Sequence, residues 1–120
     1  MQAGKTYQWH KVAEHIAELP WGPNNLCEVE VAGTQLCLAR VQEVVYGCAR
    51  KCPHAGGAMS RGFIDAFGHI VCPLHRYKFS LQNGRNVSGE GYHLKTYPVQ
   101  LREDGVYVGL EAGGLFGFFR

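Results

Sequence analysis

Apolar and polar side chains alternate with a period of two residues along much of this chain. In residues 26–31, a cysteine and two valines alternate with two glutamates, which is the pattern of a strand with one buried face. Turn signals separate runs of this kind, among them Ala32-Gly33-Thr34 and the pair Asn83-Gly84, and Asn-Gly strongly favours a hairpin turn. The pattern predicts strands at 26–31, 35–41, 43–48, 62–66, 68–72, 78–81, 96–102 and 106–110.

The N-terminal part of the sequence has a different spacing. Tyr7 and Trp9 precede Val12, Ile16 and Leu19, which predicts a short first strand followed by one or two helical turns. Sixteen glycines indicate many tight turns. With about eight to ten short strands and almost no helix, the predicted fold class is all-β, an antiparallel β-sandwich or barrel.

Length and composition narrow the class of protein further. A chain of 120 residues is long enough for one ordinary domain and too short for two, so we expect a single domain over 1–120 with its core at about 7–110. Apolar residues make up 46% and charged residues 18% of the chain, as in globular proteins. A formal net charge of +2 indicates no preference for nucleic acid or for a membrane surface.

The cysteines and the apolar runs bear on the cellular compartment. No stretch approaches the roughly 18 apolar residues of a membrane span, and residues 1–20 contain no apolar run typical of a secretion signal. Five cysteines are an odd number, whereas a disulfide framework favours an even one. We therefore expect a soluble, cytoplasmic protein. Cys27, Cys37 and Cys48 fall in predicted strands, where a free thiol usually acts as a small buried hydrophobe.

Two short segments carry the candidate chemistry. Cys52-Pro53-His54 and Cys72-Pro73-Leu74-His75 each provide one thiol and one imidazole, and seventeen residues separate them. In the first segment the two donors are two residues apart, so an extended backbone points both to the same side. A set of two cysteines and two histidines divided in this way matches the Rieske [2Fe–2S] centre, in which two histidines replace two cysteines on one iron.

The residues around these segments extend the match. The sequence His54-Ala55-Gly56-Gly57 and the run from Cys72 to Phe79 resemble Rieske-type ferredoxins and the Rieske domains of ring-hydroxylating oxygenases. The resemblance covers about Trp9 to Leu110. It implies a β-sandwich core with a small cluster-binding subdomain at about 50–80, formed by two ligand loops.

The resemblance also implies a role for each donor. Cys52 and Cys72 would bind the inner iron of one [2Fe–2S] cluster, and His54 and His75 would bind the outer iron through Nδ1. Backbone N–H groups at Gly56-Gly57 are expected to approach the bridging sulfides. These four donors are the candidate cofactor-binding and metal-binding residues, and no catalytic residue is expected.

The sequence departs from the family pattern at three places, and the first two indicate the low-potential, ferredoxin-like branch of the family. The positions that carry an extra disulfide in respiratory Rieske proteins are Gly57 and Leu74 here. Tyr77 is offset from the tyrosine that hydrogen-bonds the cluster in that branch. The covering loop, usually Gly-Pro-Ala, is Gly89-Glu90-Gly91.

Cationic residues gather in the sequence around the two segments. Between positions 50 and 78 there is one acid, Asp65, and the cationic residues are Arg50, Lys51, Arg61, Arg76 and Lys78. We expect them to form a positive rim that steers an acidic patch of a redox partner to the site.

The predicted function is that of a soluble, monomeric electron carrier that takes one electron from a reductase and passes it to a terminal oxygenase. Two alternatives stay open. One is a non-catalytic small subunit of a larger redox enzyme, similar to the small subunit of assimilatory nitrite reductase. The other is a binding module stabilised by zinc, because two cysteines and two histidines also suit Zn²⁺.

Overall fold

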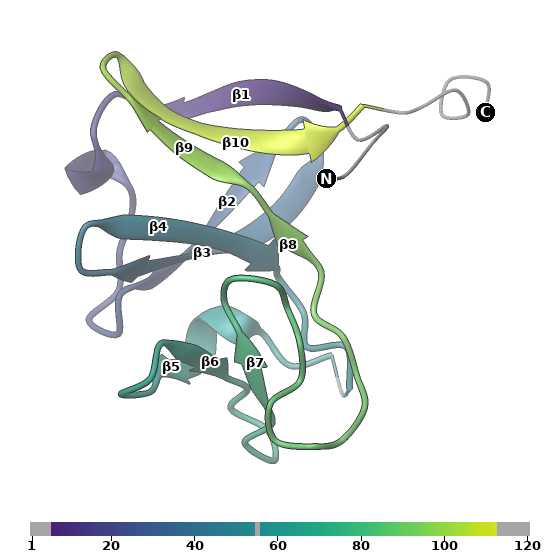
Figure 1. The fold of residues 1–120 in the computed structure, drawn as a ribbon. Coiled ribbons are helices and arrows are strands. Elements are labelled where there is room, and N and C mark those ends of the chain that lie inside the picture. The colour runs from purple at the N-terminus through teal and green to yellow at the C-terminus, as the bar shows by residue number, and fades with distance from the viewer. Residues whose placement is uncertain (1–5, 55, 113–120) are drawn as a thin grey trace.

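The chain forms three antiparallel sheets that lie one above another (Figure 1). The computed structural model describes residues 6–54 and 56–112. The strands of this part are β1 (Tyr7–Ala13), β2 (Leu26–Val31), β3 (Thr34–Val41), β4 (Val44–Ala49), β5 (Phe63–Ile64), β6 (His69–Val71), β7 (Lys78–Ser80), β8 (Thr96–Tyr97), β9 (Val99–Arg102) and β10 (Gly105–Glu111). Two short 3-10 helices accompany them, η1 (Ile16–Glu18) and η2 (Met59–Arg61).

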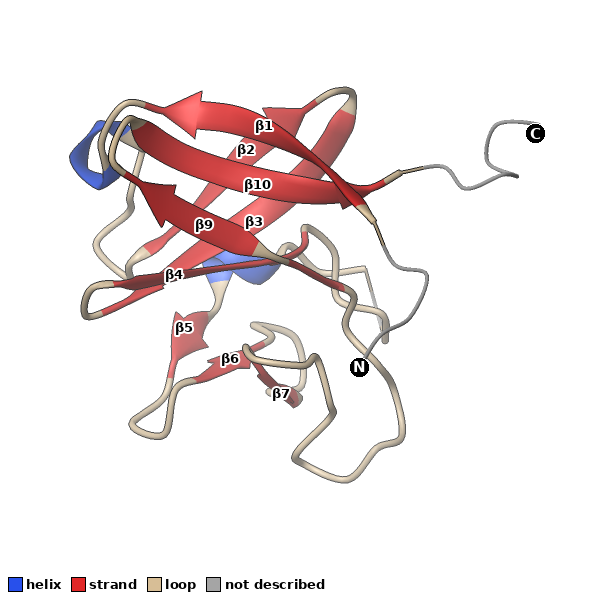
Figure 2. Ribbon diagram, turned by 45° about the horizontal axis from the view of Figure 1, so that its top comes forward, coloured by secondary structure: helices blue, strands red, loops and turns tan. Residues whose placement is uncertain are grey.

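The three sheets have a simple order. The upper sheet is β1-β10-β9, the middle sheet is β2-β3-β4-β8, and the lower sheet is β5-β6-β7. Figure 2 shows the strands of the upper and middle sheets as long ribbons and those of the lower sheet as short ones joined by long loops. The all-β prediction, with an antiparallel sandwich-like core and a smaller appended part, is confirmed.

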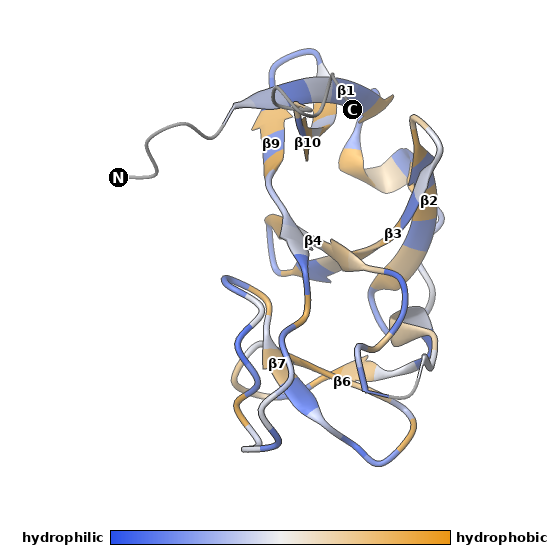
Figure 3. Cartoon of the chain, turned by 90° about the vertical axis from the view of Figure 1, so that its right-hand side faces the viewer, coloured by the Kyte–Doolittle hydropathy of each residue, from blue (hydrophilic) through white to orange (hydrophobic). Residues whose placement is uncertain are grey.

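The middle sheet is covered on both faces, which explains the run of four buried residues at its centre. Leu36 and Leu38 on β3 point into an upper core shared with Val106 and Val108 of β10. The neighbouring residues of β3 point the other way, into a lower core between the middle and lower sheets. That lower core consists of Leu26, Cys37, Ala39, Cys48, Cys52, Met59, Ile70, Cys72, Phe79, Leu81 and Leu94. Figure 3 shows hydrophobic residues along β3, β4 and β6 on the two sides of this core.

Most of the predicted strands are present, and one is wrong in an informative way. The strand expected at 96–102 is divided at Pro98: β8 pairs with β4 in the middle sheet, and β9 pairs with β10 in the upper sheet. Proline has no N–H to donate to a ladder, and its carbonyl accepts instead from the Gly109 N–H at 2.9 Å. Residues 96–102 therefore cross from one sheet to the other.

The cysteines outside the two motif segments behave as predicted. Cys27, Cys37 and Cys48 are free and buried, on β2, β3 and β4. Burial raises the pKa of the Cys27 thiol to about 12, and a hydrogen bond with Cys48 together with burial raises the pKa of Cys37. The thiols of Cys27 and Cys37 therefore stay protonated at neutral pH. Among the described residues, no helix has the length and apolar character that crossing a membrane requires.

Candidate metal centre

Two loops next to the lower sheet carry the motif residues. The first loop, residues 50–58, connects β4 to η2. Its base is closed by a hydrogen bond from the Met59 N–H to the Arg50 carbonyl at 2.8 Å. Within it, the Cys52 N–H donates to the Gly57 carbonyl at 2.8 Å, and the Gly56 N–H donates to the Cys52 carbonyl at 2.9 Å. The Gly56 N–H is therefore engaged inside its own loop, and the approach of the Gly56-Gly57 pair to a bridging sulfide stays a prediction.

The second loop, residues 72–77, connects β6 to β7. The Cys72 N–H donates to the Tyr77 carbonyl at 2.9 Å, which closes the loop. At its tip, His75 and Arg76 have φ values of 63° and 60°, a left-handed conformation that costs free energy in residues other than glycine. Two such residues in succession reverse the chain and place the His75 ring at the exposed end of the loop.

The two loops meet closely. A Cβ on Gly57 would lie 2.9 Å from Leu74 Cδ1 and 3.6 Å from Cys72 Sγ, so the absence of a side chain there lets the first loop approach the second. Cys52 and Cys72 are 2% and 0% exposed, and the two thiols lie close enough for each to affect the ionisation of the other. Burial first, and then the Cys52 thiol, raise the pKa of the Cys72 thiol to about 11, against the lowering effect of the Leu74 N–H.

Two imidazoles and two phenol rings lie beside the sulfur pair. The ring centroids of His54 and His75 are 5.0 Å apart at an interplanar angle of 61°. Tyr77 lies 4.1 Å from the His54 ring, and Tyr92 lies 5.3 Å from it. The sequence identified Tyr77 only as offset from the tyrosine that hydrogen-bonds the cluster in respiratory Rieske proteins. It gave no signal for Tyr92, because Tyr92 lies in a loop without hydrophobic periodicity.

One nitrogen in this group has no partner of its own. His54 Nδ1 is buried and makes no hydrogen bond, a state that costs free energy unless something else binds the atom. The other side-chain nitrogen of this kind in the described residues, His10 Nε2, lies on β1 in the upper sheet, away from both loops. A neutral imidazole nitrogen is a common metal ligand, so an unpaired Nδ1 on the loop that also carries the buried Cys52 fits a metal cluster.

The donors form two pairs instead of one compact set. In the described part of the chain, no three His, Cys, Asp or Glu side chains are grouped closely enough to hold a single metal ion. A Rieske cluster does not require such a group, because each of its two irons takes two protein ligands and the bridging sulfides complete the rest.

The expected positive rim is only partly present. Arg50 Nε lies 3.3 Å from Glu28 Oε1 on β2, and Ser60 donates to the same carboxylate at 2.7 Å. Lys78 Nζ lies 3.7 Å from Asp65 Oδ2. Because Glu28, which lies outside positions 50–78, pairs with Arg50, the net positive charge beside the two loops is smaller than the local sequence suggested.

The comparisons with known proteins agree with this geometry. The chain matches the Rieske-like [2Fe–2S] domain family over residues 8–109. It is 33% identical over 96 residues to the ferredoxin component of a naphthalene 1,2-dioxygenase system from Pseudomonas aeruginosa, which covers 79% of this chain and 89% of that protein. It is 36% identical over 122 aligned positions to the nitrite reductase (NAD(P)H) of Emericella nidulans, which covers 88% of this chain and 11% of that protein.

A solved structure extends the comparison to three dimensions. A chain from the complex of reduced oxygenase and oxidized ferredoxin in carbazole 1,9a-dioxygenase aligns with a TM-score of 0.69 and 28% identity, over 83% of this chain and 91% of that chain. The chain described here belongs to the Rieske-like [2Fe–2S] domain family. It is an electron-transfer protein of the ferredoxin type, and its cofactor is a Rieske [2Fe–2S] cluster, as the two motif segments predicted.

Proposed function

We propose that Cys52, His54, Cys72 and His75 hold the cluster, with both thiolates on the inner iron and both imidazoles on the outer iron through Nδ1. The observation that carries this assignment is the buried, unpaired His54 Nδ1, on a loop that also carries the buried Cys52 and packs closely against the loop of the buried Cys72. When bound, the cluster supplies a centre that gains and loses a single electron.

The surrounding residues have separate tasks. Burial of Cys52 and Cys72 keeps water from the sulfur side of the site. His75 and Leu74 are exposed on the tip of the second loop, so an electron has its shortest way out of the protein there. Tyr77 covers one face of the His54 ring.

We further propose that the electron passes from a reductase to a terminal oxygenase. The support is the similarity to a ferredoxin component of a dioxygenase system and to a chain of an oxygenase–ferredoxin complex. The proposal includes a single domain over 1–120, a monomer, and a cytoplasmic location, since the buried free thiols fit a reducing compartment. The proposal keeps the cluster-binding part at about 50–80, and Leu94, from the loop that follows, packs in the same lower core.

Anaerobic purification followed by iron, sulfide and electron paramagnetic resonance measurements tests the assignment. We expect about two irons and two inorganic sulfides per chain and a Rieske spectrum. His75→Ala should abolish that spectrum, whereas His69→Ala, which removes another histidine of the cluster-binding part, should keep it. Colourless protein with zinc, or an unchanged spectrum in His75→Ala, would contradict the assignment.

A second candidate function has its own support. The similarity to nitrite reductase covers 88% of this chain but only 11% of that long protein, as expected if this chain served as one part of a nitrite-reducing assembly. Co-expression with a nitrite reductase catalytic polypeptide distinguishes the two functions. A stable complex that survives gel filtration, together with electron delivery to nitrite but not to an oxygenase, would favour the second candidate.

A further inference from the structure

A loop that follows β7 lies over the His54 ring, and it stands where the family pattern has a different sequence. The two ends of this covering loop, residues 86–93, are joined by an antiparallel backbone β-bridge between Arg85 and His93. Next to the bridge, the Leu94 N–H donates to the Gly84 carbonyl at 3.0 Å. Gly84 has a φ of +79°, and a Cβ there would lie 1.9 Å from the Leu94 carbonyl oxygen. The base is therefore fixed by backbone contacts that only glycine allows.

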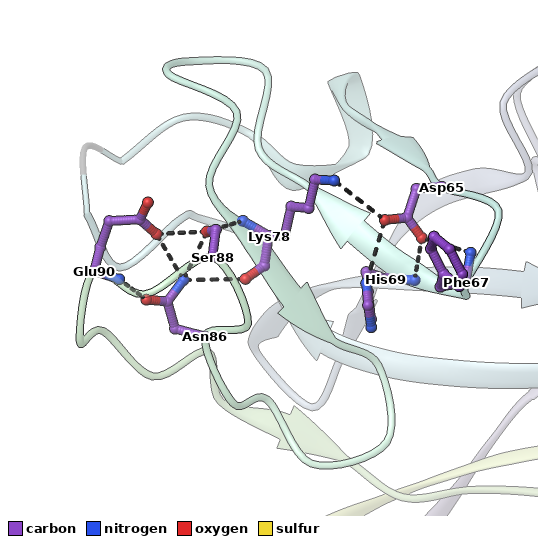
Figure 4. Close-up of polar contacts among 7 residues, drawn as sticks. All are labelled: Asp65, Phe67, His69, Lys78, Asn86, Ser88 and Glu90. Atoms are coloured by element: carbon purple, nitrogen blue, oxygen red, sulfur yellow. Dashed lines mark hydrogen bonds and ion pairs between the residues drawn. The ribbon is translucent and has the colours of Figure 1, made fainter.

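The interior of the covering loop is held by one side chain, Asn86 (Figure 4). Its Oδ1 accepts the N–H of Glu90 and, at 2.7 Å, the N–H of Gly91. Its Nδ2 is shared by the Lys78 carbonyl at 3.0 Å, Glu90 Oε1 at 2.9 Å and Ser88 Oγ at 3.2 Å. We call Asn86, Ser88 and Glu90 the loop network. A single amide thus joins both sides of the loop to β7.

The loop network has a second attachment to β7 at the same residue. Ser88 Oγ accepts the Lys78 N–H at 2.9 Å and donates to Glu90 Oε1. Figure 4 shows that Lys78 also reaches Asp65 with its side chain. Both backbone groups of Lys78 are therefore bonded to the network.

The attachments adjoin the two tyrosines that cover His54. Lys78 follows Tyr77, whose ring lies 4.1 Å from the His54 ring. Gly91 precedes Tyr92, whose ring lies 5.3 Å from His54 and is stacked on Tyr77 at 5.9 Å. Each tyrosine is thus one residue away from a hydrogen bond of the network, so the network fixes both rings against one imidazole.

The network also fixes a charge. Hydrogen bonds from Ser88 and Asn86 hold the pKa of Glu90 below its ordinary value, and the attraction to His54 acts in the same direction. Burial first, and then the same carboxylate, raise the pKa of Tyr77. Because Asn86 and Ser88 hold this carboxylate in the same loop that carries Tyr92 over His54, its negative charge lies on the histidine side of the site.

We propose that Asn86 and Glu90 are positioning residues for His54: Asn86 holds Tyr77 and Tyr92 over its ring, and Glu90 keeps a fixed negative charge beside it. This proposal rests on the ligand role of His54 proposed above. It predicts two separable effects. The two tyrosine rings over His54 control how fast the site loses iron. The negative charge of Glu90 opposes the arrival of an electron and so lowers the reduction potential.

Four variants of the holoprotein separate these effects. Asn86→Ala removes the network, and Asn83→Ala is its matched control. Asn83 also accepts a backbone N–H in the neighbouring turn, from Arg85 at 2.9 Å, but it makes no bond to the covering loop. Glu90→Gln keeps an oxygen that accepts the two side-chain hydrogen bonds and removes the charge, whereas Glu90→Ala removes both.

The measurements are the rate of bleaching in excess iron chelator, the reduction potential, and amide hydrogen exchange in the covering loop. We expect Asn86→Ala to bleach about tenfold faster, since the loss of several exposed hydrogen bonds destabilises the closed loop by about 1–2 kcal/mol. Exchange at residues 90–92 should accelerate as well, and Asn83→Ala should match the wild type. Glu90→Gln should bleach at the wild-type rate but have a higher potential, with a difference that shrinks at high salt. Glu90→Ala should show both changes.

The possible results show separately whether this inference or the proposed function is wrong. A wild-type protein without a Rieske spectrum overturns both. If the wild type has that spectrum but Asn86→Ala and Asn83→Ala bleach and exchange at equal rates, the proposed role of Asn86 in holding the two tyrosines over His54 is wrong. If Glu90→Gln has the same reduction potential as the wild type, the proposed effect of the Glu90 charge is wrong. Neither of these last two results affects the ligand assignment.

Discussion

The upper part of this molecule, which comprises the upper and middle sheets, and its lower part, which comprises the lower sheet and its loops, are held together by different interactions. In the upper part, long strands pair over most of their length: β10 has seven residues and β3 has eight. In the lower part, β5 has two residues, and β6 and β7 have three each. Ladders this short fix little backbone, so the lower part needs other interactions to hold its loops in place.

Polar side chains supply many of those interactions. Asn24 donates to the carbonyls of Ser60 and Gly62 at 2.9 and 3.0 Å, which fixes η2. Asp65 accepts the N–H groups of Phe67 and His69, both at 2.9 Å, which closes the turn between β5 and β6. The upper part stays folded chiefly through apolar burial, whereas the lower part depends on side-chain hydrogen bonds and, we propose, on bound iron. Metal binding contributes to folding where the site is not formed in the unfolded chain.

The largest effect should come from removing one sulfur donor. We expect Cys72→Ser to lose the cluster completely and to speed amide exchange in β6 and β7, while β1 and β10 keep their protection. Iron content and hydrogen exchange by mass spectrometry measure this. Cys27→Ser, a buried thiol of the upper core, is the control that should retain iron. Equal loss of protection in β10 and β6 after Cys72→Ser would show that the two parts do not differ in this way.

A second test compares one large side chain from each core. Phe79 in the lower core and Leu38 in the upper core are both 0% exposed. Phe79→Ala should cost about 3–5 kcal/mol of unfolding free energy and Leu38→Ala about 2–5 kcal/mol. Only Phe79→Ala should also accelerate the release of iron to a chelator. Urea titration and bleaching rates measure the two quantities, and faster iron release in Leu38→Ala would contradict the separation of the cores.

The smallest effect should come from the charge of Asp65. Burial raises the pKa of this carboxyl, but the N–H groups of His69 and Phe67 and the charge of His69 lower it more, so it lies below the ordinary value of 3.8. Its stabilising contribution is therefore present above that value and is lost as the pH falls through the lower, folded-state pKa. Asp65→Asn should cost at most about 1 kcal/mol at pH 7.

Unfolding measurements at pH 7 and at several values below 4 check this contribution. The difference in stability between the wild type and Asp65→Asn should shrink as the pH falls, because a protonated aspartate resembles asparagine. A constant difference over this range would show that the charge of Asp65 contributes nothing.

Local patterns were sufficient for much of the fold and for the juxtaposition of the motif residues. Alternation predicted residues 26–31 as a strand, and β2 has those bounds. The spacing inside Cys52-Pro53-His54 and Cys72-Pro73-Leu74-His75 is short, so each pair of donors is defined by its own loop. The meeting of the two loops agrees with the family resemblance, while their ligand role stays a prediction.

Other features depend on which segments lie side by side, and no local pattern encodes that. Alternation continues through Pro98, so only the pairing partners of β8 and β9 reveal the crossing between sheets. Glu28 meets Arg50 from another strand. The covering loop has no periodicity, and the bonds of Asn86 inside it follow from its folded shape.

The small residues on the lower face of the middle sheet have a consequence for the whole molecule. Cys37, Ala39 and Cys48 leave room that Met59 and Phe79 fill from below. Side-chain volume at Ala39, a residue without any chemistry of its own, therefore helps to set how far the end of the molecule with the lower sheet stands from the middle sheet. A methyl group added there would lift that end outward at a cost of about 1–3 kcal/mol. The two ligand-bearing loops would then shift relative to the upper and middle sheets without the replacement of any group that we propose to bind iron.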